Sequence, residues 1–329
     1  GEDAGASIAS GGNQNVLIGK DAGTAITTGD DNVAVGYQAL DANTTGGNSV
    51  AVGSNALGAQ TTGDRNIAIG STAGAAITTG QGSIAIGHQA LASATTGDDN
   101  IAIGADSPTV NAALEANTTG VQNVAIGGGA LAANTTADKN TALGFQSLGK
   151  NTTANNNTAV GFQALYDNTT GAQNVAVGMF ALPNNTSAAY NTAVGYGAME
   201  ANTTGASNTA IGGSALYSAT TASNNTAVGV EAMENTTVGY ENVAVGYKAL
   251  EANVDGRHAV ALGVEALKLQ EPSSASSTYN TAVGPYCGAA ITTGIQNSLV
   301  GAFAGDALVG ASDNVAVGYS ALTTNVGGQ

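Results

Sequence analysis

The sequence predicts an all-β protein, a parallel β-solenoid (β-roll) of about eighteen 17-residue coils that assembles as a homotrimer. Three observations carry the solenoid prediction: a glycine that recurs with a 17-residue period, three strand-forming residues before each of these glycines, and paired exchanges of large and small side chains within single repeats. Together they indicate coils that lie directly over one another, each placing its side chains over those of the coil below.

The repeat follows the signature N-x-A-V-G-x-x-A-L-x-x-N-T-T-G and covers nearly the whole chain. Its fifth residue, called the signature glycine below, occurs eighteen times, and fifteen of the seventeen steps between copies have the same 17-residue length. The two exceptions are longer and run from Gly104 to Gly127 and from Gly263 to Gly284. A disordered chain has no physical reason to keep this register, whereas a solenoid must keep it.

Each coil is expected to consist of a short strand, a glycine corner, a second short segment and a turn. The three residues before the signature glycine, as in 33–35, form the strand. The last of them is Val, Ile or Leu in all eighteen copies, which suits a buried β-ladder. Asn and Gly tolerate the left-handed conformation that sharp corners need. At about 4.8 Å per coil, eighteen coils would make a rod on the order of 85 Å long.

The fourth and seventh positions after the signature glycine exchange large side chains with each other. Most coils carry Leu or Met at the fourth position and a polar residue at the seventh. Four coils carry the reverse arrangement, namely Gly23 with Ile26, Gly74 with Ile77, Gly288 with Ile291 and Gly305 with Leu308. We expect both positions to reach one core volume, because leaving it empty would cost about 2–5 kcal/mol.

Alternation along the strand places its middle residue on the opposite face from its first and third residues. That middle residue is Ala in sixteen copies, and Leu17 and Leu299 are the exceptions. With the first and third residues buried, the alanines would form an apolar stripe on the outside, which favours self-association. The alternative is that Ala is simply tolerated beside a narrow core.

Residues 1–329 are expected to form a single repeat domain. The two long steps predict surface insertions within 105–112 and 268–279, each with one proline, and insertions in solenoids often lie on the working face. The alternative is a neutral interruption of the ladder. Residues 3–8 repeat the pattern of 21–26, so we also expect the chain to be part of something longer.

Composition excludes several classes of protein. A net charge of −16 with only seven Lys and Arg residues is the wrong electrostatics for nucleic acid. No apolar run approaches the roughly 18 residues of a membrane span, so no membrane insertion is expected. The single cysteine, Cys287, excludes a disulfide framework, and we expect it to be a small buried thiol.

The sequence concentrates no catalytic groups, and we predict no enzyme, no cofactor and no bound metal. The two histidines, His88 and His258, lie about ten coils apart. Asp30, Asp64 and Asp98 share one column but stand two coils, or roughly 10 Å, apart. That is too far for two of them to hold one Ca²⁺, and solvated turn acids are the better interpretation. A polysaccharide-cleaving solenoid would need clustered acids along one groove.

Aromatic residues and insertion prolines are the candidate binding residues. Aromatic side chains directly follow the signature glycine in six coils, and stacked rings on an exposed face suit a cell-surface glycan or a protein receptor. The alternative is that the rings pack at a coil corner or a subunit contact. The candidates are Tyr37, Phe145, Phe162, Tyr196, Tyr247 and Tyr319, together with Pro108 and Pro272.

The repeat as it stands in 157–171 and 191–205 resembles the repeats of two related groups. One is the head domain of trimeric autotransporter adhesins, whose shorter A-[IV]-G repeats form left-handed β-rolls assembled as trimers. The other is phage tail-fibre and tailspike proteins with N-T-A-V-G-Y-Q-A-L repeats. The resemblance covers residues 11–329 and implies a trimeric fibre segment that is extracellular, on a cell surface or on a virion.

Two functions are therefore expected. The first is a structural and adhesive fibre module, a rigid rod that presents several copies of a binding face to a host or surface. The alternative is a subunit of a self-polymerising extracellular filament in which solenoid ends stack coil on coil. In both, the main partner is the chain itself.

Overall fold

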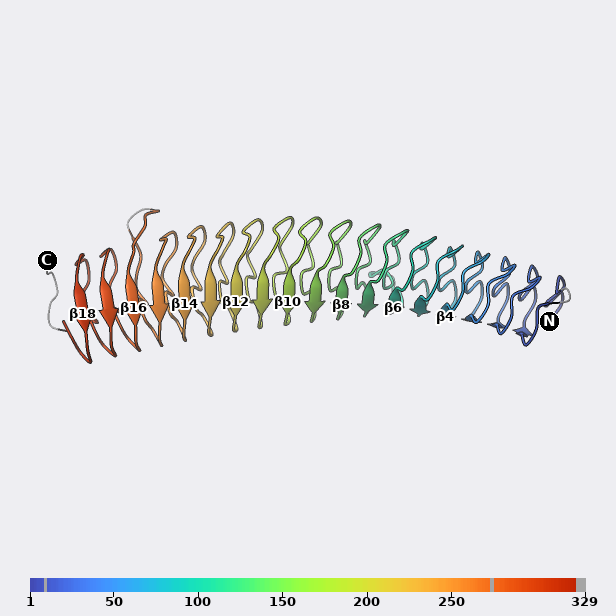
Figure 1. Cartoon of the computed structure of the whole chain (residues 1–329), viewed down its shortest axis with the longest axis horizontal. Coiled ribbons are helices and arrows are strands. Elements are labelled where there is room, and N and C mark those ends of the chain that lie inside the picture. The colour runs from blue at the N-terminus through green and yellow to red at the C-terminus, as the bar shows by residue number, and fades with distance from the viewer. Residues whose placement is uncertain (9–10, 273–274, 324–329) are drawn as a thin grey trace. The chain divides into compact units, whose positions relative to one another are not determined.

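The computed structural model describes residues 1–8, 11–272 and 275–323. The chain divides into two compact units, residues 1–170 and residues 171–329. Each unit is a parallel β-solenoid with one three-residue strand in every coil, and no helix occurs within the described ranges (Figure 1). The predicted all-β solenoid of about eighteen 17-residue turns is confirmed, whereas assembly as a homotrimer stays a prediction.

Eighteen strands lie within the described residues. Unit 1 contains β1 (Val16–Ile18), β2 (Val33–Val35), β3 (Val50–Val52), β4 (Ile67–Ile69), β5 (Ile84–Ile86), β6 (Ile101–Ile103), β7 (Val124–Ile126), β8 (Thr141–Leu143) and β9 (Thr158–Val160). Unit 2 contains β10 (Val175–Val177), β11 (Thr192–Val194), β12 (Thr209–Ile211), β13 (Thr226–Val228), β14 (Val243–Val245), β15 (Val260–Leu262), β16 (Thr281–Val283), β17 (Ser298–Val300) and β18 (Val315–Val317).

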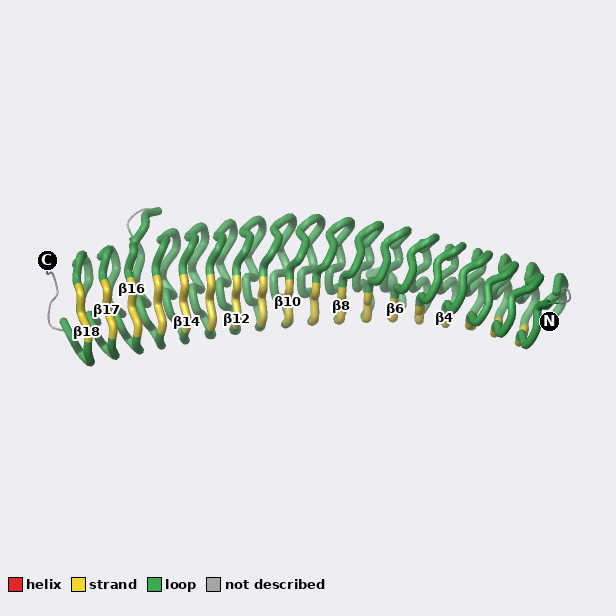
Figure 2. The backbone as a smooth tube through the Cα atoms, in the orientation of Figure 1, coloured by secondary structure: helices red, strands yellow, loops and turns green. Residues whose placement is uncertain are grey.

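Equivalent residues of successive coils pair directly, so that Ala193 of β11 faces Ala210 of β12 in a parallel ladder. The strands are short, and most of each coil is irregular in conformation (Figure 2). The irregular part is nonetheless hydrogen bonded from coil to coil, as where Met199 N donates to Ala215 O at 3.0 Å and Thr203 N to Thr220 O at 3.0 Å. Stacking therefore continues around the coil well beyond the strands.

The signature glycine is required by both its conformation and its surroundings. Gly36 has φ +142°, a region that side chains rarely adopt. A Cβ atom on Gly36 would lie 2.4 Å from the carbonyl oxygen of Gly53, the signature glycine of the next coil. The predicted glycine corner is present, and it is also a point at which neighbouring backbones approach closely.

The strands bury the face opposite to the one predicted. The middle alanine is fully buried, as at Ala34 and Ala193, whereas the flanking residues are half-buried or exposed, with Ile69 at 42% and Ile211 at 41% exposure. The prediction of a buried ladder directly before the signature glycine is wrong, and so is the prediction of an outer alanine stripe. The reason is space, because the interior of a coil already holds a buried leucine such as Leu40.

Coils with a leucine in the strand middle show how little space there is. Leu17 belongs to the same coil as Gly23. A Cβ atom on Gly23 would lie 2.8 Å from both Leu17 Cδ2 and Ile26 Cδ1. A Cβ atom on Gly305 would likewise lie 2.9 Å from Leu299 Cδ1 and 3.0 Å from Leu308 Cδ1. The predicted exchange between the fourth and seventh positions is confirmed, and the strand middle shares the same core volume.

The leucine at the fourth position has a left-handed backbone, with φ +52° at Leu40 and at Leu216. A non-glycine residue in this conformation costs about 1–2 kcal/mol. Complete burial of the leucine side chain contributes about 1.5–3 kcal/mol and offsets that cost. The predicted second short segment is thus a run of tight turns that points a large side chain inward.

A column of buried asparagines, four residues before the signature glycine, links each coil to the next. The side-chain oxygen of Asn208 accepts a hydrogen bond from the backbone N–H of Asn225 at 3.0 Å. Its Nδ2 donates to Ala222 O at 2.8 Å and to Asn191 Oδ1 at 3.2 Å. Asn123 and Asn140 repeat this arrangement in unit 1. The amides satisfy backbone groups that the irregular part of the coil would otherwise leave unpaired.

Replacing Asn208 by Ala is expected to destabilise the chain by about 1–3 kcal/mol for each buried backbone group left unpaired, here Asn225 N–H and Ala222 C=O. Asn235→Ala, at an exposed asparagine of the same unit, is the matched control and should change little. Denaturant unfolding followed by circular dichroism measures both. Equal stability of the two variants would contradict a structural role for the buried column.

The shared core volume predicts a rescue within the coil that contains Ala85, Leu91 and Ala94, all buried. Ala85→Leu alone should cost about 1–3 kcal/mol, because the coil is overpacked. Adding Leu91→Gly and Ala94→Leu copies the coil of Leu299 and should recover most of the loss. The pair Leu91→Gly with Ala94→Leu is the control and should stay near wild type. The idea fails if thermal unfolding shows the triple variant no more stable than Ala85→Leu.

Candidate functional site

Residues at the second and fifth positions after the signature glycine form one face of the solenoid, called the corner face below. The two positions of one coil are neighbours, as the 2.8 Å contact between Lys248 Nζ and Glu251 Oε1 shows. Stacking repeats them in each coil, so side chains from successive coils meet. In unit 2 the corner face carries Glu231, Glu234, Lys248, Glu251, Glu265, Lys268, Tyr286, Phe303 and Asp306.

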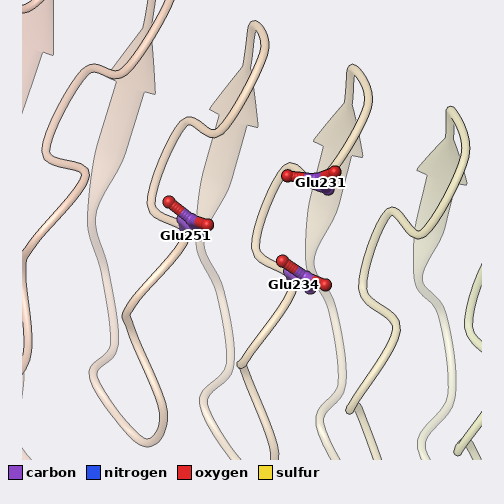
Figure 3. A group of neighbouring side chains, drawn as sticks. All are labelled: Glu231, Glu234 and Glu251. Carbon is purple, nitrogen blue, oxygen red and sulfur yellow. The ribbon is translucent and has the colours of Figure 1, made fainter.

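Three carboxylates gather on the corner face of unit 2. Glu231 and Glu234 come from one coil and Glu251 from the next, and each offers an oxygen within 4.8 Å of the others (Figure 3). Lys248 bridges two of them, with Nζ 3.0 Å from Glu231 Oε2 and 2.8 Å from Glu251 Oε1. Lys268 extends the ion pairs to Glu265 at 3.2 Å.

The charges of this cluster perturb one another. Hydrogen bonds to Glu251 and Glu231 raise the pKa of the Lys248 ammonium. Burial, and then the charges of Glu231 and Glu251, raise the pKa of the Glu234 carboxyl, an effect that Lys248 partly opposes. A divalent cation bound by the three glutamates would have to displace Lys248 from two of them, Glu231 and Glu251. The cluster is therefore best described as an ion-pair network, and we assign no metal to it.

A groove of about 340 Å³ adjoins the ion pairs and is called the Tyr286–Phe303 groove. Ala289 and Ala290 occupy the positions that Lys268 and Leu269 hold in the preceding coil, so two small side chains leave a depression there. The groove is lined by Glu265, Lys268, Leu269, Tyr286, Ala289, Ala290, Phe303 and Asp306. The rings of Tyr286 and Phe303 are parallel, with centroids 5.1 Å apart and planes 6° apart.

A second groove, of about 210 Å³, lies on the corner face of unit 1. Its lining includes Val110 and Asn111 of the first predicted insertion, and Tyr166. The insertion is held in a tight turn by an antiparallel bridge, in which Ser107 N donates to Val110 O at 2.7 Å. Pro108 is exposed on this turn. The insertion within 105–112 therefore contributes directly to a groove.

The six predicted aromatic residues are all exposed, between 40% and 77%. Of these, the structure brings together Phe145 and Phe162, whose rings stack at 5.7 Å with planes 8° apart. Tyr319 meets Phe303 edge to face at 5.9 Å and so lies beside the Tyr286–Phe303 groove. Tyr37, Tyr196 and Tyr247 lie on separate coils and form no joint site.

The second predicted insertion, within 268–279, is only partly described, because residues 273–274 lie outside the described ranges. Pro272 is buried, and its Cγ lies 3.1 Å from where a Cβ atom on Gly256 would stand. Pro272 therefore packs inward and offers no surface for binding. The burial of Pro272 does not support its predicted role as a binding residue.

Two further groups of residues that the sequence singles out have structural roles. The column of Asp30, Asp64 and Asp98 accepts hydrogen bonds from backbone N–H groups of the preceding coil at 2.6, 2.7 and 2.8 Å, respectively. These acids therefore join coils in addition to meeting solvent. Cys287 is fully buried, as predicted, and burial raises its pKa to about 11, which leaves it a poor nucleophile.

Sequence reasoning missed the corner face because it followed the position directly after the signature glycine. The available signal was one residue further on. Glu231, Lys248 and Glu265 alternate in charge at the second position of consecutive coils, and Tyr286 and Phe303 then follow. In-register stacking turns such a column into contacts.

No protein-family model matches the chain, and no curated protein matches it. Among the residues that the structure describes, no helix is both long and apolar enough to span a membrane.

Lys248→Gln tests the ion-pair network, since glutamine occupies the same position at Gln38 and Gln163. Without the shared cation, the melting temperature should fall at about pH 7, where the glutamates are charged. The raised pKa of Glu234 means that the folded state binds this proton more tightly, so lowering the pH should recover stability. The deficit is therefore expected to shrink towards about pH 4.

Lys139→Gln, at an exposed lysine whose position also carries Gln14 and Gln122, is the matched control for this pH series. Its melting temperature should follow that of the wild type throughout. A deficit of Lys248→Gln that is the same at both pH values would contradict electrostatic repulsion as its cause.

Proposed function

We propose that the chain is a structural and adhesive fibre module, extracellular, at a cell surface or on a virion, and without enzymatic activity. It acts as a homotrimer and presents its corner face to a receptor. The solenoid fold suits this role, because a structural repeat protein repeats one surface many times and so offers several copies for avidity.

The outward face of the strands is the observation that carries the proposal. Its two residues per strand are mostly Val, Ile, Leu and Thr, and they stack in register within each unit. Ile18, Ile69 and Leu143 are exposed in unit 1, and Ile211, Val245 and Val300 in unit 2. A lone solenoid in water should carry polar residues on such a face, so the aliphatic columns support self-association.

The corner face supports the adhesive part of the proposal. It carries charged and aromatic side chains whose order differs from coil to coil, so the chemical character of the surface changes along a regular scaffold. A glycan or protein receptor suits this surface. Nucleic acid does not, because the chain carries 23 Asp and Glu residues against seven Lys and Arg residues.

The alternative function is a self-polymerising filament. Coils of two chains would stack through the same backbone and asparagine hydrogen bonds that join coils within one chain, as between Asn191 and Asn208. Electron microscopy separates the two functions. Discrete particles of fixed length are expected for the fibre module, and indefinite filaments would contradict it.

The self-association surface is tested by Ile211→Lys combined with Val245→Lys, which places two charges on the outward strand face. Light scattering after size exclusion should give three times the 31.7 kDa chain mass for the wild type and a single chain mass for the variant. Val238→Lys is the control, because Val238 is exposed outside the strands, and it should stay trimeric. A monomeric wild type would contradict the proposal.

A further inference from the structure

We propose that the Tyr286–Phe303 groove is a saccharide-binding site that takes one or two neutral pyranose rings. The inference rests on the proposed adhesive function and names the ligand class of one segment of the corner face.

The aromatic wall is held in a fixed orientation. Tyr286 and Phe303 stand at the second position of consecutive coils, with left-handed backbones of φ +57° and +58°. Stacking holds their rings parallel, and Tyr319 closes against Phe303 at its edge. Because the two rings stack on each other, they offer a ligand their edges and the outer face of the exposed Tyr286, and a pyranose ring would pack its face of C–H groups on that outer face. The small side chains of Ala289 and Ala290 leave the space for it.

The groove also holds an unused hydrogen-bond acceptor. The Asp306 carboxylate lines the groove, and its Oδ1, which lies beneath the surface, has no hydrogen-bond partner within the described part of the chain. A carboxylate without a partner is unfavourable, so a ligand that brings a donor to the part of this carboxylate that lines the groove gains from meeting it. A sugar hydroxyl is such a donor.

Lys268 supplies the complementary donor, and its charge is paired with that of Glu265 in the same lining. Its Nζ lies 3.2 Å from Glu265 Oε2 and 3.8 Å from Glu251 Oε2, and it holds a positive charge in the groove lining. A hydroxyl can both donate to Asp306 and accept from Lys268, whereas an arginine or lysine side chain only donates and so could use Asp306 but not Lys268. The volume of about 340 Å³ lies at the lower end of ordinary ligand sites, roughly 300–1,000 Å³, which limits the ligand to a few rings at most.

Saturation-transfer NMR on the full chain tests the site with methyl glycosides of glucose, galactose, mannose, N-acetylglucosamine and N-acetylgalactosamine as probes. At least one glycoside should receive saturation, most strongly at the C–H protons of one ring face. Hexa-arginine serves as the cationic probe. Binding of the glycoside should change little between about 50 mM and about 500 mM salt, since no charge pair forms.

Three variants assign the signal to the groove. Tyr286→Gln, with the residue found at Gln38, and Asp306→Asn should each weaken glycoside binding on the order of tenfold. Tyr196→Ser, with the residue found at Ser54, removes an exposed ring outside the groove and should leave binding unchanged. Circular dichroism confirms that each variant remains folded.

Two outcomes would overturn the inference. In the first, no glycoside gives a saturation signal that depends on Tyr286. In the second, hexa-arginine binds the groove and no glycoside does. The oligomeric state is measured on the same samples by light scattering. A trimer that binds no glycoside contradicts the saccharide site and leaves the fibre module standing. A monomer that binds a glycoside through Tyr286 supports the site and contradicts the trimer.

Discussion

Register between successive coils is the constraint on which the rest of the molecule depends. Only three residues in each coil are in a strand, and the rest of the coil has no regular secondary structure to satisfy its backbone. These residues bond instead to the next coil, directly or through buried amides such as Asn191 and Asn208. A shift within the stacked part of a coil would break many of these bonds at once, which explains why nearly every coil keeps the same length. The two longer coils still pair their strands in register, as Ile101 with Val124 and Val260 with Thr281.

The same register explains the small core. Backbones approach closely at the signature glycines, and the interior of most coils holds one large side chain. That side chain comes from the fourth position at Leu40 and from the seventh at Ile77. The coil of Leu299 holds two, one from the strand middle and one from the seventh position, because its fourth position is glycine. Alanine is therefore the interior residue of most strands, and the larger aliphatic residues lie outside, where they remain available for contact.

The fold was predictable from the sequence, because a 17-residue period and an exchange such as Gly74 with Ile77 have a direct geometric meaning. Which face of the strand points inward was not predictable, because both faces are apolar. Hydrophobicity alone does not show whether the valine column or the alanine column is buried. Leu17 and Leu299 indicate the inward face, since each is followed by a glycine at the fourth position of its own coil. A large residue in the strand middle thus occurs together with a small residue at a core position. The left-handed Leu40 had no signal, because this conformation is unusual for leucine. The corner face was readable only as a column two residues after the glycine.

Hydrogen exchange measures whether the irregular part of the coil is bonded as firmly as the strands. Backbone amides such as Met199, Thr203 and Asn208 lie outside the strands and donate to the next coil or to a buried amide. We predict that they exchange as slowly as the strand amides of Thr192–Val194, because they open only when coils separate. If these three amides exchanged as fast as amides in open loops while the strand amides stayed protected, register between coils would not be the main constraint.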